Sequence, residues 1–234
     1  MLQDLLNDFK KLANKEKAKL LQGFFKTGKG EYGEGDIFLG LVVPEQRKLA
    51  KKYPNLSLDY LQELLNSKIH EHRLTALFIL ISQYKKVSEK QKELIYKLYL
   101  RNTKNINNWD LIDLSSPNIV GDYLYNHKSE QKILYELARS KSLWERRIAI
   151  LATFMFIKYN KFDHTLKLAE ILLKDKHDLI HKAVGWALRE LGKKDEKLLC
   201  KFLDKHKAEM PRTMLRYSIE KFPEEKRKYY LSKT

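Results

Sequence analysis

The chain has 234 residues, of which 43% are hydrophobic and 32% are charged, so it can bury a core beneath a well-solvated surface. No run of 18 or more apolar residues occurs, which excludes a membrane span from the prediction, and 9 Gly and 5 Pro are few for an all-β chain. The amphipathic start is not a signal peptide, and the single Cys200 cannot form an internal disulfide. We therefore expect a cytoplasmic protein that crosses no membrane.

The charge is the first functional indication. Lys and Arg number 46 against 30 Asp and Glu, which gives a net charge of +16 and a pI near 9.6. A surface this basic attracts polyanions, most commonly nucleic acid. A lysine-rich composition with no specific partner is the alternative, and it is supported by pairs such as Lys10-Lys11, Lys51-Lys52 and Lys193-Lys194, which are typical of solvated faces.

Helical periodicity runs through most of the chain. Apolar residues recur three and four positions apart in many segments, and none alternates as a half-buried strand would. Residues suited to helix N-caps stand at Ser57, Ser88, Ser129, Ser142 and Asp163. The predicted helical segments are residues 5–25, 58–66, 70–84, 89–101, 130–139, 142–159, 164–173, 177–192 and 195–206.

A glycine-rich stretch at residues 27–36 interrupts this pattern. It contains a formal GxGxxG from Gly28 to Gly33, but it follows a helical segment rather than a strand and has no surrounding βαβ unit. A dinucleotide site is therefore not predicted. We interpret the stretch as a flexible loop, and the alternative is a loop whose N–H groups contact a phosphate backbone.

The later segments repeat. Arg73, Trp109, Arg146 and Lys182 can be set in one register with steps of 36, 37 and 36 residues, and PRTMLRYSIEKF follows 30 residues later. Helix pairs of this length cannot bury their apolar faces alone, so they stack on one another. The period predicts an all-α fold, a right-handed solenoid of HEAT-like antiparallel helix pairs, forming a single domain over residues 1–234.

Asp113 breaks this register, because the same slot holds aliphatic Leu77 and Ile150 in other units. A carboxylate there must be hydrogen-bonded or serve a purpose. Trp109 lies one helical turn earlier, and Trp186 and Arg147 occupy related slots, so these side chains could meet on one surface. In the alternative interpretation Asp113 caps a helix end and the tryptophans belong to the core.

A metal site is not predicted. His177 and His181 are four residues apart on one predicted helix, but the sequence offers no HExxH motif and no evident third ligand.

Three segments together resemble the AlkD-type DNA glycosylases, the DNA alkylation repair enzyme family. They are NNWDLIDLSSPNIVGDYL (107–124), LWERRIAIL (143–151) and HKAVGWALRELGK (181–193), and FLGLVVPEQRKLAKKY (38–53) is similar to the family's N-terminal segment. The resemblance covers residues 20–230 or so.

The resemblance implies a HEAT-like fold that binds duplex DNA and hydrolyses the N-glycosidic bond of cationic N3- and N7-alkylated purines. By motif, Asp113 would be the catalytic carboxylate, and Trp109 and Trp186 would pack against the lesion's deoxyribose. Further DNA contacts are expected from Arg147, which would hold a phosphate, and from Phe25, Lys26 and Arg189.

No cofactor is expected, and we expect a monomer. The sequence departs from the family where the glycine-rich loop separates Phe24-Phe25-Lys26 from Phe38-Leu39-Gly40. The competing interpretation is therefore a catalytically inactive paralogue, a repeat protein that binds DNA or another protein.

Overall fold

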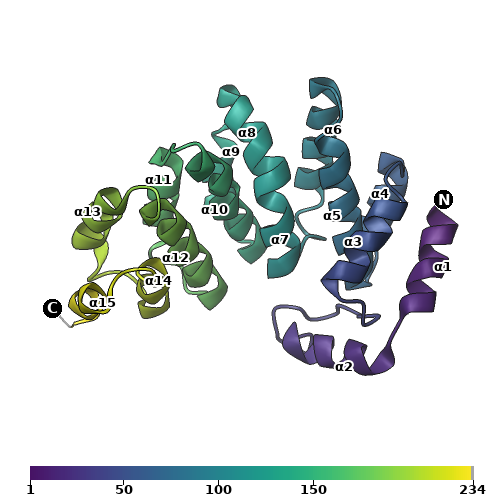
Figure 1. Cartoon of the computed structure of the whole chain (residues 1–234), viewed down its shortest axis with the longest axis horizontal. Coiled ribbons are helices and arrows are strands. Elements are labelled where there is room, and N and C mark those ends of the chain that lie inside the picture. Colours follow the sequence, from purple (N-terminus) through teal and green to yellow (C-terminus); the bar gives the residue numbers. More distant parts are fainter. Residues whose placement is uncertain (233–234) are drawn as a thin grey trace. The chain divides into compact units, whose positions relative to one another are not determined.

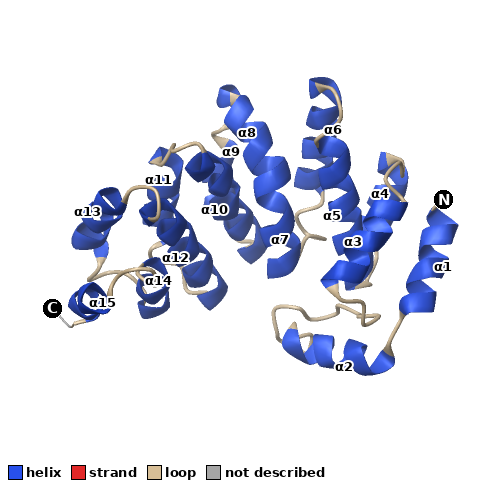
Figure 2. Ribbon diagram, viewed as in Figure 1, coloured by secondary structure: helices blue, strands red, loops and turns tan. Residues whose placement is uncertain are grey.

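The computed structural model describes residues 1–232 and divides into two compact units, Met1–Ser115 and Ser116–Thr234. Helices dominate both units (Figures 1 and 2), and within the described residues the extended pairing is limited to an isolated bridge between Ile37 and Ile69. The all-α prediction is confirmed. The prediction of one continuous repeat domain concerns the arrangement of the two units and stays a prediction.

In the first unit, α5 (His70–Tyr84) is the central helix and is buried along most of its length. The helices α3, α4 and α6, which are near it in the sequence, pack against it, as in a repeat array. The remaining helices of this unit are α1 (Leu2–Leu12), α2 (Lys15–Phe24), α3 (Val43–Lys52), α4 (Leu58–Leu65), α6 (Glu89–Arg101) and α7 (Trp109–Ser116).

In the second unit, α10 (Leu143–Lys158) and α12 (Asp178–Gly192) are the central helices, each packed against its neighbours in sequence. Gly185 allows α12 to approach α14, because a Cβ there would lie 2.5 Å from the Cβ of Tyr217. The other elements are η1 (Pro117–Gly121), α8 (Asp122–Asn126), η2 (Lys128–Glu130), α9 (Ile133–Ala138), α11 (Asp163–Leu172), α13 (Glu196–His206), α14 (Arg212–Ser218) and α15 (Glu224–Leu231).

A recurring hydrogen bond supports the internal repeat. Arg73 donates to the carbonyl of the residue six positions earlier, Ser67, at 2.8 Å, and Arg146 does the same to Ser140 at 3.0 Å. In the next unit His181 makes this contact with the Asp175 carbonyl, so the equivalent position is His181 and the predicted alignment on Lys182 was wrong by one residue. Each of these units therefore repeats a side-chain hydrogen bond near its helix start as well as the spacing of its apolar residues.

Helix boundaries agree with the sequence in part. Ser57 and Ser142 accept N-cap hydrogen bonds, and Ser88 forms a capping box with Gln91. Ser129 lies inside η2, and Asp163 is the first residue of α11 rather than its cap, so these two assignments were wrong. The predicted segment 5–25 is two helices, because the chain turns at Ala13 and Asn14. None of the helices among residues 1–232 is long and apolar enough to cross a bilayer.

Candidate functional site

Trp109 begins α7 on a platform of aromatic rings in the first unit. Its half-buried ring stacks on Phe25 at 5.2 Å, and Phe25 in turn stacks on Phe38 at 5.1 Å. Phe24 meets Trp109 edge-on at 5.9 Å. Such offset and edge contacts stabilise aromatic clusters beyond simple burial, so the tryptophan is supported from beneath and remains partly open.

Two polar side chains secure the backbone on either side of Trp109. The Asn108 side chain accepts a hydrogen bond from the Trp109 amide at 2.8 Å, and Asp110 accepts one from Leu111 at 2.8 Å. These are the first N–H groups of α7, which have no partner within the helix. The orientation of the helix start is therefore determined locally.

Asp113 lies one turn further along α7 and is half-buried. It stands close to Tyr99, whose fully buried hydroxyl bonds to the Ser115 hydroxyl at 2.9 Å. Burial raises the pKa of Tyr99, and the negative charge of Asp113 raises it further, whereas the Ser115 hydrogen bond lowers it. Asp113 thus places a carboxylate at the edge of an apolar core.

The alternative in which Asp113 caps a helix end is wrong. α7 continues through Ser116, and the wide turn η1 and helix α8 follow without a break. Pro117 has no N–H to donate to the Asp113 carbonyl, which accounts for a helical turn of altered hydrogen bonding at this point. The same alternative also assigned the tryptophans to the core, and this is partly correct for Trp109, which packs on the aromatic core.

A buried ionic cluster lies beneath this platform, formed by Asp36, His70, Arg73 and Asp110. The His70 imidazole places Nδ1 3.0 Å from an Asp36 oxygen and Nε2 2.9 Å from an Asp110 oxygen, and Arg73 lies 2.7 Å from Asp36. Burial lowers the pKa of His70, but the Asp110 charge and the hydrogen bonds to both aspartates outweigh it and raise the pKa to about 9. Burial likewise raises the pKa of Asp36, but His70 and Arg73 hold it below its usual value.

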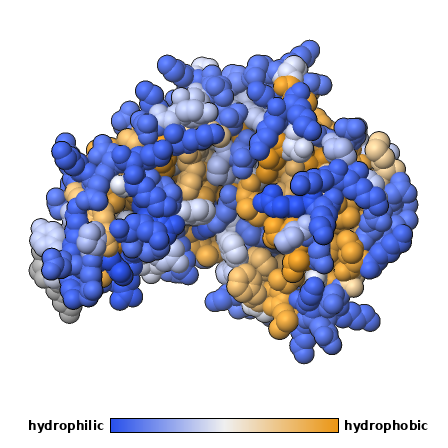
Figure 3. Space-filling model, viewed as in Figure 1, coloured by the Kyte–Doolittle hydropathy of each residue, from blue (hydrophilic) through white to orange (hydrophobic). Residues whose placement is uncertain are grey.

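The adjacent Phe24 and Phe25 differ sharply in exposure. Phe25 is only 7% exposed and forms the middle of the aromatic stack, so it is a core residue in this structure, and its contact with DNA stays a prediction. Phe24 is 63% exposed, and Leu20 one turn earlier is also exposed. Apolar atoms are visible over this end of α2 in Figure 3. Lys26, which follows them, is exposed and has a positive φ of 52°.

The glycine-rich loop is closed by its own acidic residues. The amides of Gly28 and Gly30 donate to the carboxylates of Glu31 and Glu34, at 2.9 and 2.8 Å. Because these N–H groups already have anionic partners, the structure favours a self-capped loop over one whose glycine amides bind phosphate.

The two phenylalanines give a first prediction. Phe25→Ala should lower the free energy of unfolding by about 3–5 kcal/mol, because it removes a buried ring and leaves a cavity. Phe24→Ala should change stability little, since most of the ring faces solvent. It should weaken duplex binding if this end of α2 contacts DNA. Denaturant unfolding and fluorescence anisotropy with a labelled duplex measure the two effects, and a large loss of stability in Phe24→Ala would contradict the assignment.

In the second unit, Trp186 is half-buried on α12. Its ring meets Phe154 edge-on at 4.7 Å, and its indole N–H donates to Glu190 at 3.2 Å. Arg147 on α10 is 5% exposed, and its guanidinium donates to the Leu179 carbonyl at the start of α12. This arginine joins two helices, and its predicted phosphate contact stays a prediction.

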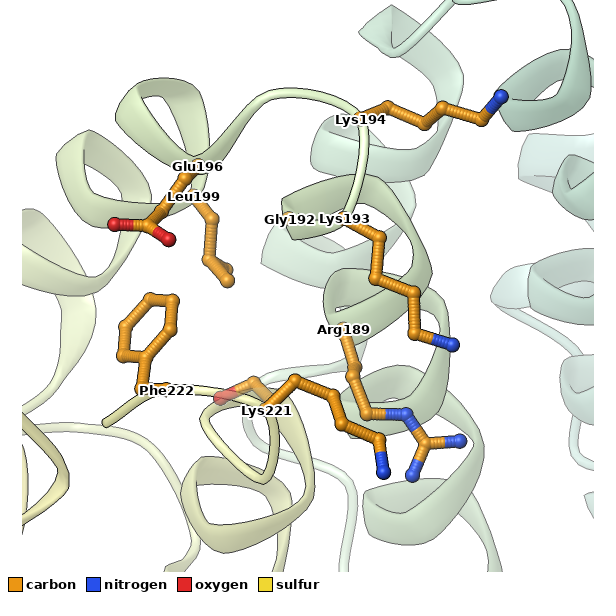
Figure 4. A pocket seen from close by; sticks show the side chains of 9 residues that line it. Arg189, Gly192, Lys193, Lys194, Glu196, Leu199, Lys221 and Phe222 are labelled. Carbon is orange, nitrogen blue, oxygen red and sulfur yellow. The ribbon is translucent and has the colours of Figure 1, made fainter. Parts of the chain in front are cut away.

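Arg189 borders a pocket of about 380 Å³ formed by α12, α13 and the segment after α14. In Figure 4 the side chains of Arg189, Lys193 and Lys221 extend toward one side, while Leu199 and Phe222 line the interior. Arg189 forms ion pairs with Glu190 and Glu220, and these acids also pair with Lys193 and Lys221 respectively. The pocket is basic, but its cations are partly neutralised.

The two histidines considered for metal binding have other roles. His177 accepts a hydrogen bond from the Leu179 amide at 3.1 Å, and His181 makes the repeat contact with Asp175. Among residues 1–232 no group of three or more His, Cys, Asp or Glu side chains has a geometry suited to a metal ion.

The predicted residues divide between the units. Trp109, Asp113, Phe25 and Lys26 belong to the first, and Arg147, Trp186 and Arg189 to the second. That these two groups act on one ligand stays a prediction. Sequence analysis missed the Asp36–His70–Arg73–Asp110 cluster, whose only signal was the density of polar residues at the start of an otherwise apolar helix.

Comparisons with known proteins agree with this architecture. A predicted DNA alkylation repair enzyme from Enterococcus faecalis has a similar structure, with a TM-score of 0.70 and 17% identity over 91% of this chain and 97% of that one. AlkD2 from Streptococcus mutans follows with a TM-score of 0.55 and 19% identity over 90% and 99% of the two chains. A search of curated proteins found no significant match. The family model for the DNA alkylation repair enzyme matches residues 5–222, and the chain belongs to this family.

Proposed function

We propose that this protein is a DNA glycosylase that hydrolyses the N-glycosidic bond of cationic N3- and N7-alkylated purines in duplex DNA. The observation that carries the proposal is the position of Asp113. It is half-buried inside α7, at the edge of an apolar core, one turn after an aromatic-supported Trp109. A repeat protein that served only as a scaffold would have no need of a carboxylate there.

The chemistry suits these residue types. An alkylated purine such as 7-methylguanine already carries a positive charge, so it can leave as a neutral base without a general acid. Positive charge then develops on the deoxyribose, as in glycoside hydrolysis. A fixed carboxylate beside C1′ stabilises this oxocarbenium character and can orient the attacking water, and the reaction consumes one water to leave an abasic site. Tryptophan faces favour a sugar that is gaining positive charge.

DNA binding is supported by the net charge of +16 and by particular surface residues. In the first unit the exposed Phe24 contacts Trp109, and the exposed Lys26 follows it two residues later. In the second unit the cations around the Arg189 pocket can contact phosphate. Some of their ion pairs with Glu220 and Glu190 would have to break for this. Trp186 is assigned to the deoxyribose by its resemblance to the family motif.

A catalytically inactive DNA- or protein-binding paralogue is the second candidate. It is favoured by the engagement within the protein of both arginines predicted to contact DNA: Arg147 with the Leu179 carbonyl and Arg189 with Glu220. The two candidates differ in one measurable property, the appearance of abasic sites.

The deciding experiment incubates the purified protein with a duplex that contains a single 7-methylguanine and then cleaves abasic sites with alkali or an abasic-site nuclease. We expect strand cleavage at the lesion and none in a matched duplex with guanine. Anisotropy on the same duplexes reports binding separately. Salt-sensitive binding without abasic sites would instead establish the non-catalytic candidate.

A further inference from the structure

His70 occupies an unusual position at the first residue of α5. It is 1% exposed, and both of its ring nitrogens face carboxylate oxygens, those of Asp36 and Asp110. An ionised carboxylate can only accept hydrogen bonds, so each nitrogen must donate, and the ring that satisfies both contacts is the imidazolium. With both carboxylates ionised, the two contacts therefore require a charged histidine in the interior.

The charges around this ring balance. Asp36 approaches from the loop after α2, Asp110 from α7, and Arg73 from α5 itself. Glu71, the next residue on α5, instead accepts hydrogen bonds from the amides of residues 39–41. Two cations and two anions make up the cluster, and a buried cluster of this kind is tolerated only while every member keeps its partner.

The cluster bonds to the chain on both sides of Trp109. Asp110 uses one oxygen for His70 and the other for the Leu111 amide, which starts α7. Arg73, held by Asp36, donates to the Asn107 side chain at 3.1 Å. Asn107 before the tryptophan and Asp110 after it are therefore both anchored to α5.

The same imidazole also supports the tryptophan through the ring stack. His70 lies 4.5 Å from Phe38 and 5.0 Å from Phe25, and Phe25 is the ring on which Trp109 stacks. A cation against aromatic faces is favourable in this arrangement. Trp109 is therefore linked to His70 by two independent routes, the backbone of α7 and the aromatic platform.

We infer that His70 is a positioning residue for the proposed excision reaction: by bridging Asp36 and Asp110 it holds the start of α7, and with it Trp109 and Asp113, in the arrangement that the reaction needs. This inference rests on the proposed function for its catalytic consequence, but the geometric part can be tested without it.

The test compares three substitutions in the full chain. His70→Gln removes the imidazolium. Asp110→Asn keeps the size of the side chain but replaces one of its two accepting oxygens with an NH2 group, which cannot accept from His70 or Leu111. It also removes the charge that most raises the pKa of His70. His72→Gln is the matched control, because His72 is also buried on α5 but makes its side-chain hydrogen bond to Ser67.

The first readout is fluorine NMR of protein labelled with fluorotryptophan, in which the Trp109 signal is assigned by its absence from Trp109→Phe. We expect this signal to shift in His70→Gln and Asp110→Asn but not in His72→Gln. In the wild-type protein it should titrate as His70 loses its proton, near the pKa of about 9, and in Asp110→Asn at a lower pH. A Trp109 signal that is the same in the wild type and both variants would overturn the inference.

The second readout is single-turnover excision beside duplex binding. Misplacing a reacting group by about 1 Å can cost ~10²-fold in rate. We therefore expect excision to be ~10- to 100-fold slower in both variants, with nearly unchanged duplex affinity. If the wild-type protein excises nothing, the proposed function fails and the NMR arm still decides the geometric inference. If excision is normal in both variants, the positioning role is refuted while the proposed function stands. Should His70→Gln not fold, Asp110→Asn carries both readouts.

Discussion

Replacement of Asp113 by asparagine is expected to slow excision of 7-methylguanine by ~10²–10³-fold, the loss typical of removing one preorganised electrostatic partner of a transition state. Asparagine keeps the shape of the side chain and removes its charge. Oxocarbenium character on the deoxyribose would then develop without an opposing carboxylate. The measurement is the single-turnover rate of abasic-site formation in a duplex with one lesion.

Duplex affinity should not fall with activity in this variant. Asp113 faces a polyanion in the proposed complex, so its charge opposes binding and its removal can strengthen it slightly. Asp122→Asn is a suitable control, since Asp122 is a second half-buried aspartate in the helical stretch that follows α7. Equal activity of wild type and Asp113→Asn would remove Asp113 from the mechanism, and an unfolded Asp113→Asn would assign it a structural role.

Gly40→Ala is expected to lower stability strongly. Gly40 has a φ of 93°, which side chains rarely adopt, and a Cβ there would lie 2.1 Å from the Asn14 carbonyl oxygen and 2.8 Å from the Ala18 amide. Both contacts are with backbone at the start of α2, which cannot turn aside as a side chain can. Overpacking costs about 1–3 kcal/mol and a left-handed backbone about 1–2 kcal/mol, so we expect a loss of roughly 2–5 kcal/mol in the free energy of unfolding.

This substitution also tests how α2 supports the candidate site. α2 leads into Phe25, on which Trp109 stacks, so displacement of α2 should increase the exposure of Trp109. Gly35→Ala is the matched control, because Gly35 has a similar φ of 86° with open space where a Cβ would be. It should show the conformational cost alone. An equal loss of stability in both variants, measured by denaturant unfolding, would refute the steric argument.

Several features could be determined from the sequence by itself. The spacing of apolar residues predicted an all-α chain, because a helix must present one apolar face to its neighbours whatever their arrangement. The repeat register placed Asp113 in a slot that holds aliphatic Leu77 and Ile150 in two other units, and the residues around Trp109, Arg147 and Trp186 indicated the family. These features depend on local periodicity and on sequence motifs, so they can be recognised without knowing how the helices pack.

Other features were decided only by tertiary structure. Phe24 and Phe25 are adjacent and chemically identical, and only the packing of α2 against Phe38 and Trp109 determines which one is buried. The sequence pattern could not show that Arg147 would be enclosed between α10 and α12.

The ionic cluster around His70 is the clearest case. Asp36 and Asp110 lie 34 and 40 residues from His70 along the chain, and neither forms a recognisable motif with it. Their contact depends on a loop, the first residue of α5 and the first turn of α7 meeting at one point. Sequence spacing carries no information about such a meeting, because hydrogen-bond partners in a folded protein are selected by distance in space, and that distance is a property of the packed core.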